Sequence, residues 1–124
     1  MPTPSIRSEA LRWLSGRKPR PGHVVASKRY LPGESWTAEK AWWIQVPDSA
    51  VEAGKLIHIL CQAESGVSSF RHLEVPAAFF RRNRHKFATI GEAKINLFLS
   101  AEHGSEFRDE RGPGRVSLAS FERL

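Results

Sequence analysis

The sequence predicts an α+β protein with a four-stranded, mainly antiparallel sheet, short helices and an N-terminal amphipathic helix. Short segments rich in β-branched and aromatic residues recur along the chain between turn-forming residues, which is the pattern of strands. The first residues instead place apolar side chains at the spacing of a helical stripe. A chain of 124 residues suffices for one sizeable hydrophobic core, so a single domain is expected.

Residues 5–16 are predicted to form the N-terminal helix. Ser5 can cap its first turn, and Gly16 suits a left-handed residue just past its last turn. The apolar stripe consists of Ile6, Ala10, Trp13 and Leu14. The next segment, RKPRPGH, has two prolines within three residues and cannot continue the helix. We therefore expect residues 1–30 to form a helix and a basic arm, and residues 31–124 to form the α+β domain.

Four strands are predicted in the body of the chain. They cover residues 41–47, 55–62, 68–76 and 94–102. The second has apolar residues on both faces, as in a central strand, and the turn ESGV joins it to the third in a β-hairpin. Residues 24–36 are predicted to be extended or irregular, and residues 116–124 to form a short strand or a final helical turn.

Two central segments, 42–62 and 72–101, follow a similar plan. Each has a strand that ends in Val-Pro, a short helical piece, a turn containing Glu, Ala and Lys, and an apolar strand. The resulting β-α-β-β-α-β order fits a ferredoxin-like sandwich. The first connection is shorter than the dozen or so residues of a parallel crossover, so an antiparallel meander with small helices is the alternative. The near-repeat is explained either by a true duplication or by chance similarity between short stretches of sequence.

The net charge of +6 is concentrated in two parts of the chain. Residues 1–30 carry seven Lys or Arg and one acid, and residues 67–94 carry six and two. Two basic blocks on a nearly neutral body favour an anionic partner, most often nucleic acid, DNA or RNA. We therefore predict a small non-catalytic nucleic-acid-binding protein. The alternative is a protein-interaction module or accessory subunit, whose basic face meets an acidic protein or a second copy of the chain.

The second basic block centres on AFFRRNRHKF, residues 78–87. Read as a helix, it places Phe79, Phe80 and Phe87 toward the sheet and the basic residues toward solvent. Asn83 falls on the apolar side, so either the whole segment is helical or the helix stops there and a loop follows. The predicted phosphate contacts are Arg17, Lys18, Arg20, Lys28, Arg29, Arg81, Arg82, Arg84, His85 and Lys86. A helix whose solvated face is merely basic is the alternative.

One catalytic pattern competes with simple binding, although we lean toward a protein that is not an enzyme. Pro47-Asp48, followed by Glu92 and Lys94, resembles the PD-(D/E)xK pattern of nucleases, in which two acids hold Mg²⁺ and the lysine orients water. In those nucleases the acid and lysine lie inside a strand. Here Glu92 precedes one, and a turn like that of residues 52–55 in the near-repeat explains the spacing more simply.

His58 and His72 are expected to face each other across the hairpin, either as an acid/base pair or as ordinary hydrogen-bonded histidines. No metal-ligand spacing or phosphate-binding loop is evident, so no metal or cofactor is predicted. Cys61 lies in an apolar run and is expected to be a buried thiol.

The chain is predicted to be cytoplasmic, without a membrane partner. Its longest apolar stretches are much shorter than the roughly 20 residues that a membrane-spanning helix requires. The apolar segment of a secretory signal does not follow the first residues.

Overall fold

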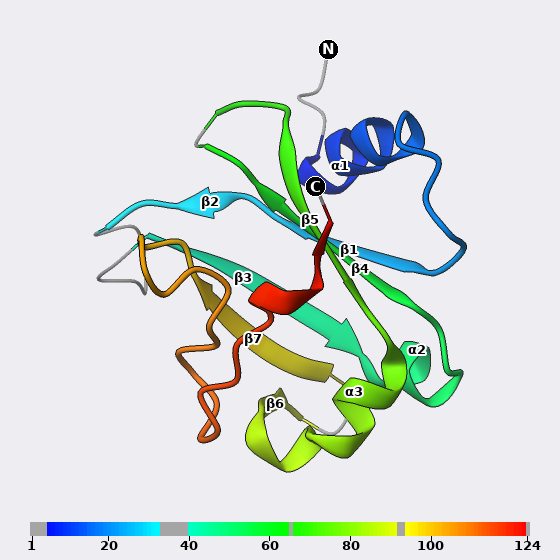
Figure 1. The fold of residues 1–124 in the computed structure, drawn as a ribbon, viewed down its shortest axis with the longest axis vertical. Coiled ribbons are helices and arrows are strands. Elements are labelled where there is room, and N and C mark those ends of the chain that lie inside the picture. Colours follow the sequence, from blue (N-terminus) through cyan, green and yellow to red (C-terminus); the bar gives the residue numbers. More distant parts are fainter. Residues whose placement is uncertain (1–4, 33–39, 65, 92–93, 124) are drawn as a thin grey trace.

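The computed structural model describes residues 5–32, 40–64, 66–91 and 94–123 of the chain. Within them the strands form two four-stranded sheets, which we call sheet 1 (β1-β4-β5-β8) and sheet 2 (β2-β3-β7-β6) (Figure 1). The strands are β1 (His23–Ser27), β2 (Arg29–Tyr30), β3 (Ala41–Pro47), β4 (Ile57–Gln62), β5 (Phe70–Val75), β6 (Ala88–Ile90), β7 (Lys94–Ser100) and β8 (Glu122–Arg123). The helices are α1 (Ile6–Ser15), α2 (Asp48–Glu52) and α3 (Ala77–Arg82), with 3-10 turns η1 (Arg84–Lys86) and η2 (Ala119–Phe121). The predicted α+β class and N-terminal helix are confirmed, but the four predicted strands divide between two sheets, β4 and β5 in sheet 1 and β3 and β7 in sheet 2.

Antiparallel pairing dominates both sheets. β4 and β5 form the predicted hairpin, with His58 opposite Glu74. β3 pairs with β7 in sheet 2, while β1 runs parallel to β4 in sheet 1. The elements follow the order β3-α2-β4-β5-α3-β6-β7, close to the predicted one. The described part of the chain contains neither of the two predicted arrangements, a single ferredoxin-like sheet or a meander, because β3 and β4 lie in different sheets.

Both segments of the near-repeat pass from a strand into a short helix at their Val-Pro dipeptides. Pro47 and Pro76 each cap a short helix in extended conformation. Proline has no amide hydrogen to donate to a strand ladder, so both strands end there. Val51 of α2 and Phe80 of α3 are both fully buried. An origin by duplication stays a prediction.

One main core joins the two sheets. Ile57 and Ile59 of β4 belong to the same buried cluster as Ile95 and Leu97 of β7. Burying an isoleucine or leucine side chain stabilises the fold by about 1.5–3 kcal/mol. Packing in this cluster therefore holds the sheets together, because the strands pair only within their own sheet.

Helix α1 covers the other face of sheet 1. Ala10 and Leu14 form a second buried cluster with Leu60 of β4 and Phe70 of β5. The ring of Trp13 lies 6.0 Å from that of Phe70, measured between centroids. β4 is consequently buried on both faces, as its apolar sequence predicts.

The predicted cap of α1 is present at its first turn but not at its last. Ser5 caps the helix as predicted, because its hydroxyl oxygen accepts from the amide of Ser8 at 3.1 Å. The predicted left-handed residue at Gly16 is wrong, since Gly16 has a φ of −70°. The left-handed conformation falls on Lys18 instead, with a φ of +50°. Residues with a β-carbon rarely adopt it, so the backbone of the arm is strained at Lys18.

The basic segment 81–86 is the end of a helix followed by a 3-10 turn, not one helical face. Asn83 ends α3, and its side-chain amide donates to the carbonyl oxygen of Phe79 at 2.9 Å. Phe80 and Phe87 are buried, as predicted. Asparagine bonds readily to nearby backbone groups, which explains why the helix stops at this residue.

Candidate anion site beside a buried histidine pair

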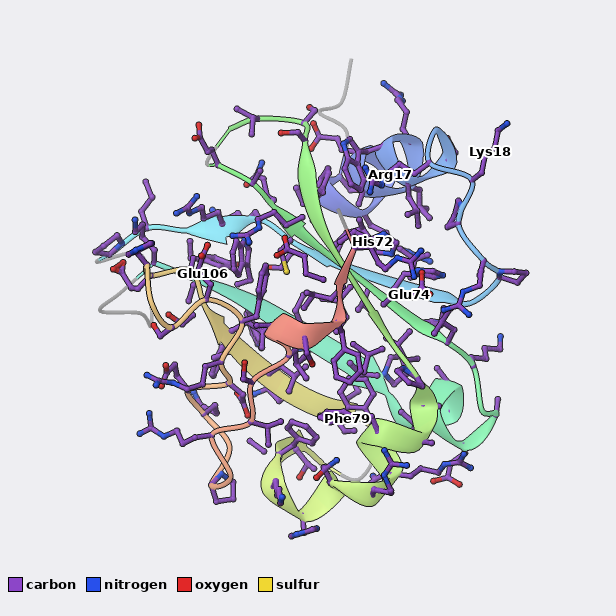
Figure 2. All side chains as sticks on the ribbon, in the orientation of Figure 1. Arg17, Lys18, His72, Glu74, Phe79 and Glu106 are labelled. Carbon is purple, nitrogen blue, oxygen red and sulfur yellow. The ribbon has the colours of Figure 1, made fainter. Side chains whose placement is uncertain are left out.

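The predicted phosphate contacts fall on separate surfaces of the molecule. The arm brings Arg17, Lys18 and Arg20 to one side of sheet 1, and Figure 2 shows the first two of them there. The basic segment 81–86, formed by the end of α3 and by η1, lies at the other end of the molecule in the same view. A compact ligand can touch one of these surfaces, whereas a long polymer can reach both.

The three arm residues border a cavity of about 380 Å³, which we call the cationic cavity. Its lining, taken from the described residues, consists of Arg17, Lys18, Pro19, Arg20, His72, Glu74 and Arg123. The four Lys and Arg side chains are positively charged at neutral pH, and Glu74 is the one acidic residue in this lining. An anion is therefore favoured here over a neutral group.

Glu74 organises the cations around the cavity. Its side chain is 5% exposed and forms an ion pair with Arg20, and Nη1 of Arg123 lies 3.9 Å from the same carboxylate oxygen. Burial acts to raise the pKa of Glu74, but Arg20 and Arg123 outweigh it, and the pKa is lowered. Glu74 is consequently ionised at neutral pH and holds these guanidinium groups near the cavity.

His58 and His72 form a hydrogen-bonded pair across the hairpin, as the sequence predicts. Nδ1 of His58 lies 2.8 Å from Nε2 of His72, and Nε2 of His58 lies 2.7 Å from the carbonyl oxygen of Arg20. A carbonyl can only accept, so neutral His58 carries its hydrogen on Nε2, and its Nδ1 accepts from Nε2–H of His72. The lone pair of the neutral His72 ring is then on Nδ1.

Burial keeps His72 from adding charge to the cavity. Desolvation, together with the neighbouring His58, lowers the pKa of His72 to about 4, although Glu74 acts in the opposite direction. His72 is therefore neutral at physiological pH. The excess of positive charge comes from the arm and from Arg123.

Backbone contacts fix the arm against sheet 1. A β-carbon on Gly22 would lie 2.3 Å from the carbonyl oxygen of Leu56 and 3.0 Å from the ring of His58. The amide of His23 donates to the same carbonyl at 2.8 Å. Only glycine fits such a close approach, so this residue lets the arm lie directly against β4.

Lys28 and Arg29, the other predicted contacts of the N-terminal block, do not line the cationic cavity. The Arg29 amide donates to the side chain of Gln62 at 2.9 Å, and its guanidinium donates to the carbonyl of Ala63 at 2.5 Å. The ammonium of Lys28 lies 4.7 Å from the ring centroid of Tyr30. Part of the function of both residues is thus structural, and their role in nucleic-acid binding stays a prediction.

In the basic segment, Arg84 differs from its neighbours because it pairs with Asp48 at the start of α2. The hydrogen bond to Asp48 raises the pKa of Arg84 above its ordinary value. The exposed residues of the segment are Arg81, Arg82, His85 and Lys86. Arg84 is therefore partly neutralised within the protein, while the exposed side chains face solvent.

The nuclease pattern is visible only in part. Glu92 lies outside the described residues. Lys94 begins β7 opposite Pro47, so it stands close to the start of α2. Asp48 is engaged by Arg84, and its Oδ1 is buried without a hydrogen-bond partner among the described residues. A Mg²⁺-dependent nuclease built on Asp48, Glu92 and Lys94 stays a prediction.

Sequence reasoning missed Glu74 and Arg123 as site residues. Glu74 follows His72 by two positions on β5 and therefore shares its face, a signal that strand alternation could have supplied. Arg123 reaches the cavity because β8 pairs with β5, which places it opposite His72. This pairing joins distant parts of the chain, and no local pattern announces it.

Comparison with known protein families, with curated proteins and with solved structures finds no match for this chain. In the described part of the chain, no helix is long and apolar enough to cross a lipid bilayer. The protein is thus defined by its own fold and site: an α+β protein with a cationic cavity beside a buried histidine pair.

Proposed function

We propose that the protein binds nucleic acid without catalysing a reaction on it, and that the cationic cavity holds a backbone phosphate. The supporting observation is the convergence of Arg17, Lys18, Arg20 and Arg123 on one cavity. Arginine presents a fork of donors that matches phosphate oxygens, and each neutralised phosphate releases counterions from the polymer.

The dimensions of the cavity and its rim also favour a phosphate on a chain. Its volume of about 380 Å³ falls at the lower end of the range for small-ligand sites, roughly 300–1,000 Å³. The side chains of Arg20 and Arg123 are 69% and 61% exposed. They can therefore contact a strand that lies across the opening as well as a group inside it.

The basic segment 81–86 supplies a second set of phosphate contacts in this proposal. It lies at the other end of the molecule from the arm (Figure 1). A polymer that spans both surfaces should bind more tightly than one that reaches a single surface. Once it is held at one surface, the effective concentration of its phosphates at the other is high. A short oligonucleotide reaches only one of them, so length dependence separates the two contributions.

Fluorescence anisotropy with labelled DNA and RNA, single- and double-stranded, tests this proposal over a series of salt concentrations. The Arg17→Gln/Lys18→Gln variant removes two charges from the cavity, and Arg81→Gln/Arg82→Gln removes two exposed charges from α3 as a matched control. With a short oligonucleotide, we expect the cavity variant to bind about tenfold more weakly. The slope of log affinity against log salt concentration should become shallower by the amount expected for about two lost phosphate contacts. The control variant should keep most of its affinity.

Several results would contradict the proposal. Absence of binding to any of the four polymers at low salt would overturn it. Loss of affinity in the α3 variant alone would move the phosphate site to the basic segment. Tighter binding to polyglutamate than to nucleic acid, in the same assay, would favour the alternative of a module that recognises an acidic protein.

A further inference from the structure

The geometry points to a metal site that the proposed function does not use. We propose that His58, His72 and Glu74 bind one divalent transition-metal ion, with Zn²⁺ as the best match. One ligand atom from each of the three residues lies within 4.8 Å of the others. The residues are 1%, 4% and 8% exposed, so the protein already shields these donors from bulk water.

The hairpin presents the three donors together. Glu74 stands directly opposite His58, and His72 precedes Glu74 by two positions on the same strand. Alternate residues of a strand share one face, so all three side chains project from the same side of sheet 1. The opposite side of both strands packs in the main core. The donors thus stand on a rigid element, which lowers the free energy needed to assemble a site.

The orientation of His58 is that of a metal ligand. Its Nε2–H donates to the carbonyl oxygen of Arg20 at 2.7 Å, which leaves the lone pair on Nδ1. A histidine that binds metal through one ring nitrogen usually donates the other N–H to a carbonyl or carboxylate. The arm therefore supplies the outer partner, and Gly22 allows the arm to lie close enough to do so.

Only small rearrangements are needed to complete the site. The hydrogen on Nε2 of His72 moves to Nδ1 of the same ring, so both facing nitrogens offer lone pairs and no net proton is released. Glu74 exchanges its ion pair with Arg20 for the metal. The Arg20 side chain is 69% exposed, so it can turn into solvent without leaving a buried charge.

Two imidazoles and one carboxylate favour zinc or cobalt over magnesium or calcium, which prefer a larger set of oxygen ligands. Three protein ligands leave a fourth position for water or another ligand. His72 and Glu74 line the cationic cavity, so this position faces it. Arg17, Lys18 and Arg123 repel a bare cation, and an anionic fourth ligand is expected to tighten binding.

Metal titration of the full chain, purified without a histidine tag and stripped with a chelator, tests the proposal. Visible absorption should show one equivalent of Co²⁺ bound with the intensity of a tetrahedral site, and Zn²⁺ should displace it. His72→Ala should weaken binding more than about 100-fold, beyond the roughly 10–100-fold effect of losing an outer partner. His103→Ala, on an exposed loop, is the control and should leave the affinity unchanged.

Arg20→Ala provides a test that keeps every ligand. The change frees Glu74 from its ion pair, so Co²⁺ affinity should rise about tenfold, the order expected for removing a competing charged hydrogen bond. Circular dichroism checks that each variant folds, and Glu74→Gln replaces His72→Ala if the latter does not. Absence of one-to-one binding in both the wild type and Arg20→Ala would overturn the proposal, as would equal affinities in the wild type and the ligand variants. None of these measurements involves nucleic acid, so the two proposals fail independently.

Discussion

Trp42 of β3 stacks on Phe107 of the C-terminal segment, with ring centroids 5.2 Å apart and ring planes inclined by 13°. Both side chains are 1% exposed. Phe107 has a φ of +66°, a left-handed conformation that residues with a β-carbon rarely adopt. The guanidinium of Arg71 lies 4.5 Å from the centroid of the Phe107 ring. The stack therefore holds a strained loop in place against the main core.

Replacing Phe107 with alanine should lower the free energy of unfolding by about 3–5 kcal/mol, because a buried aromatic ring is lost and its space is not refilled. Urea denaturation followed by tryptophan fluorescence measures the change. Val67→Ala, at a residue that is 37% exposed, is the control and should stay within about 0.5 kcal/mol of the wild type. A loss below about 1 kcal/mol in Phe107→Ala would show that the loop contributes little to stability.

Arg84→Gln should destabilise the protein by about 1 kcal/mol, because it leaves the carboxylate of Asp48, 18% exposed, without its cation. Arg81→Gln removes an exposed charge from the same segment and should have an effect within about 0.5 kcal/mol. Thermal denaturation of both variants makes the comparison. Equal stability of the two variants would mean that the ion pair between α2 and the η1 turn is energetically neutral.

Asp109 should make stability fall as the pH rises. It is 0% exposed, and burial raises its pKa, although the amides of Phe98, Arg111 and Gly112 donate to the carboxylate and act to lower it. The folded carboxyl thus keeps its proton to higher pH than the unfolded one. Its contribution is fully present below the ordinary pKa of 3.8 and is lost as the pH rises through the folded pKa.

The Asp109 effect is measured against Asp109→Asn, whose amide does not titrate. Urea denaturation from about pH 4 to about pH 7 should show the wild type losing stability relative to the variant. Parallel pH profiles in the two proteins would contradict the raised pKa.

Cys61 should be unreactive toward thiol reagents in the native protein. It is 0% exposed, and burial raises the pKa of its thiol, so the reactive thiolate is scarce. An aromatic disulfide reagent at about pH 8 should label one thiol per chain in denaturant and almost none without it. Rapid labelling of the native protein would show that the central hairpin opens locally.

The central strands could be predicted because their signals are local. β3 covers residues 41–47 as predicted, since a run of aromatic and β-branched residues ends at a proline. β4 and β5 follow from two strand-forming segments joined by a turn sequence, and the structure pairs them with His58 opposite Glu74 and Leu60 opposite His72. That register accounts for the predicted meeting of His58 and His72.

The arrangement of the sheets and the composition of the cavity depend instead on contacts between distant residues. The parallel pairing of β1 with β4 and the pairing of β8 with β5 leave no trace in the neighbouring sequence. β6 spans three residues and is too short to show a period. Charge counting located the basic arm, but it could not show that Arg17, Lys18 and Arg20 meet Arg123 while Arg29 bonds to Gln62 and Ala63.

β4 takes part in both buried clusters, with Ile59 and Cys61 in the main core and Leu60 against α1. It is also paired along both edges, by β1 and by β5. Water therefore reaches its amides only when the whole molecule opens, so deuterium uptake at Leu60 should report global rather than local stability. A ligand that binds the folded arm raises the free energy of unfolding and should therefore slow exchange at Leu60 by the corresponding factor. The exchange rate of this buried amide then reports how tightly the distant arm binds its ligand.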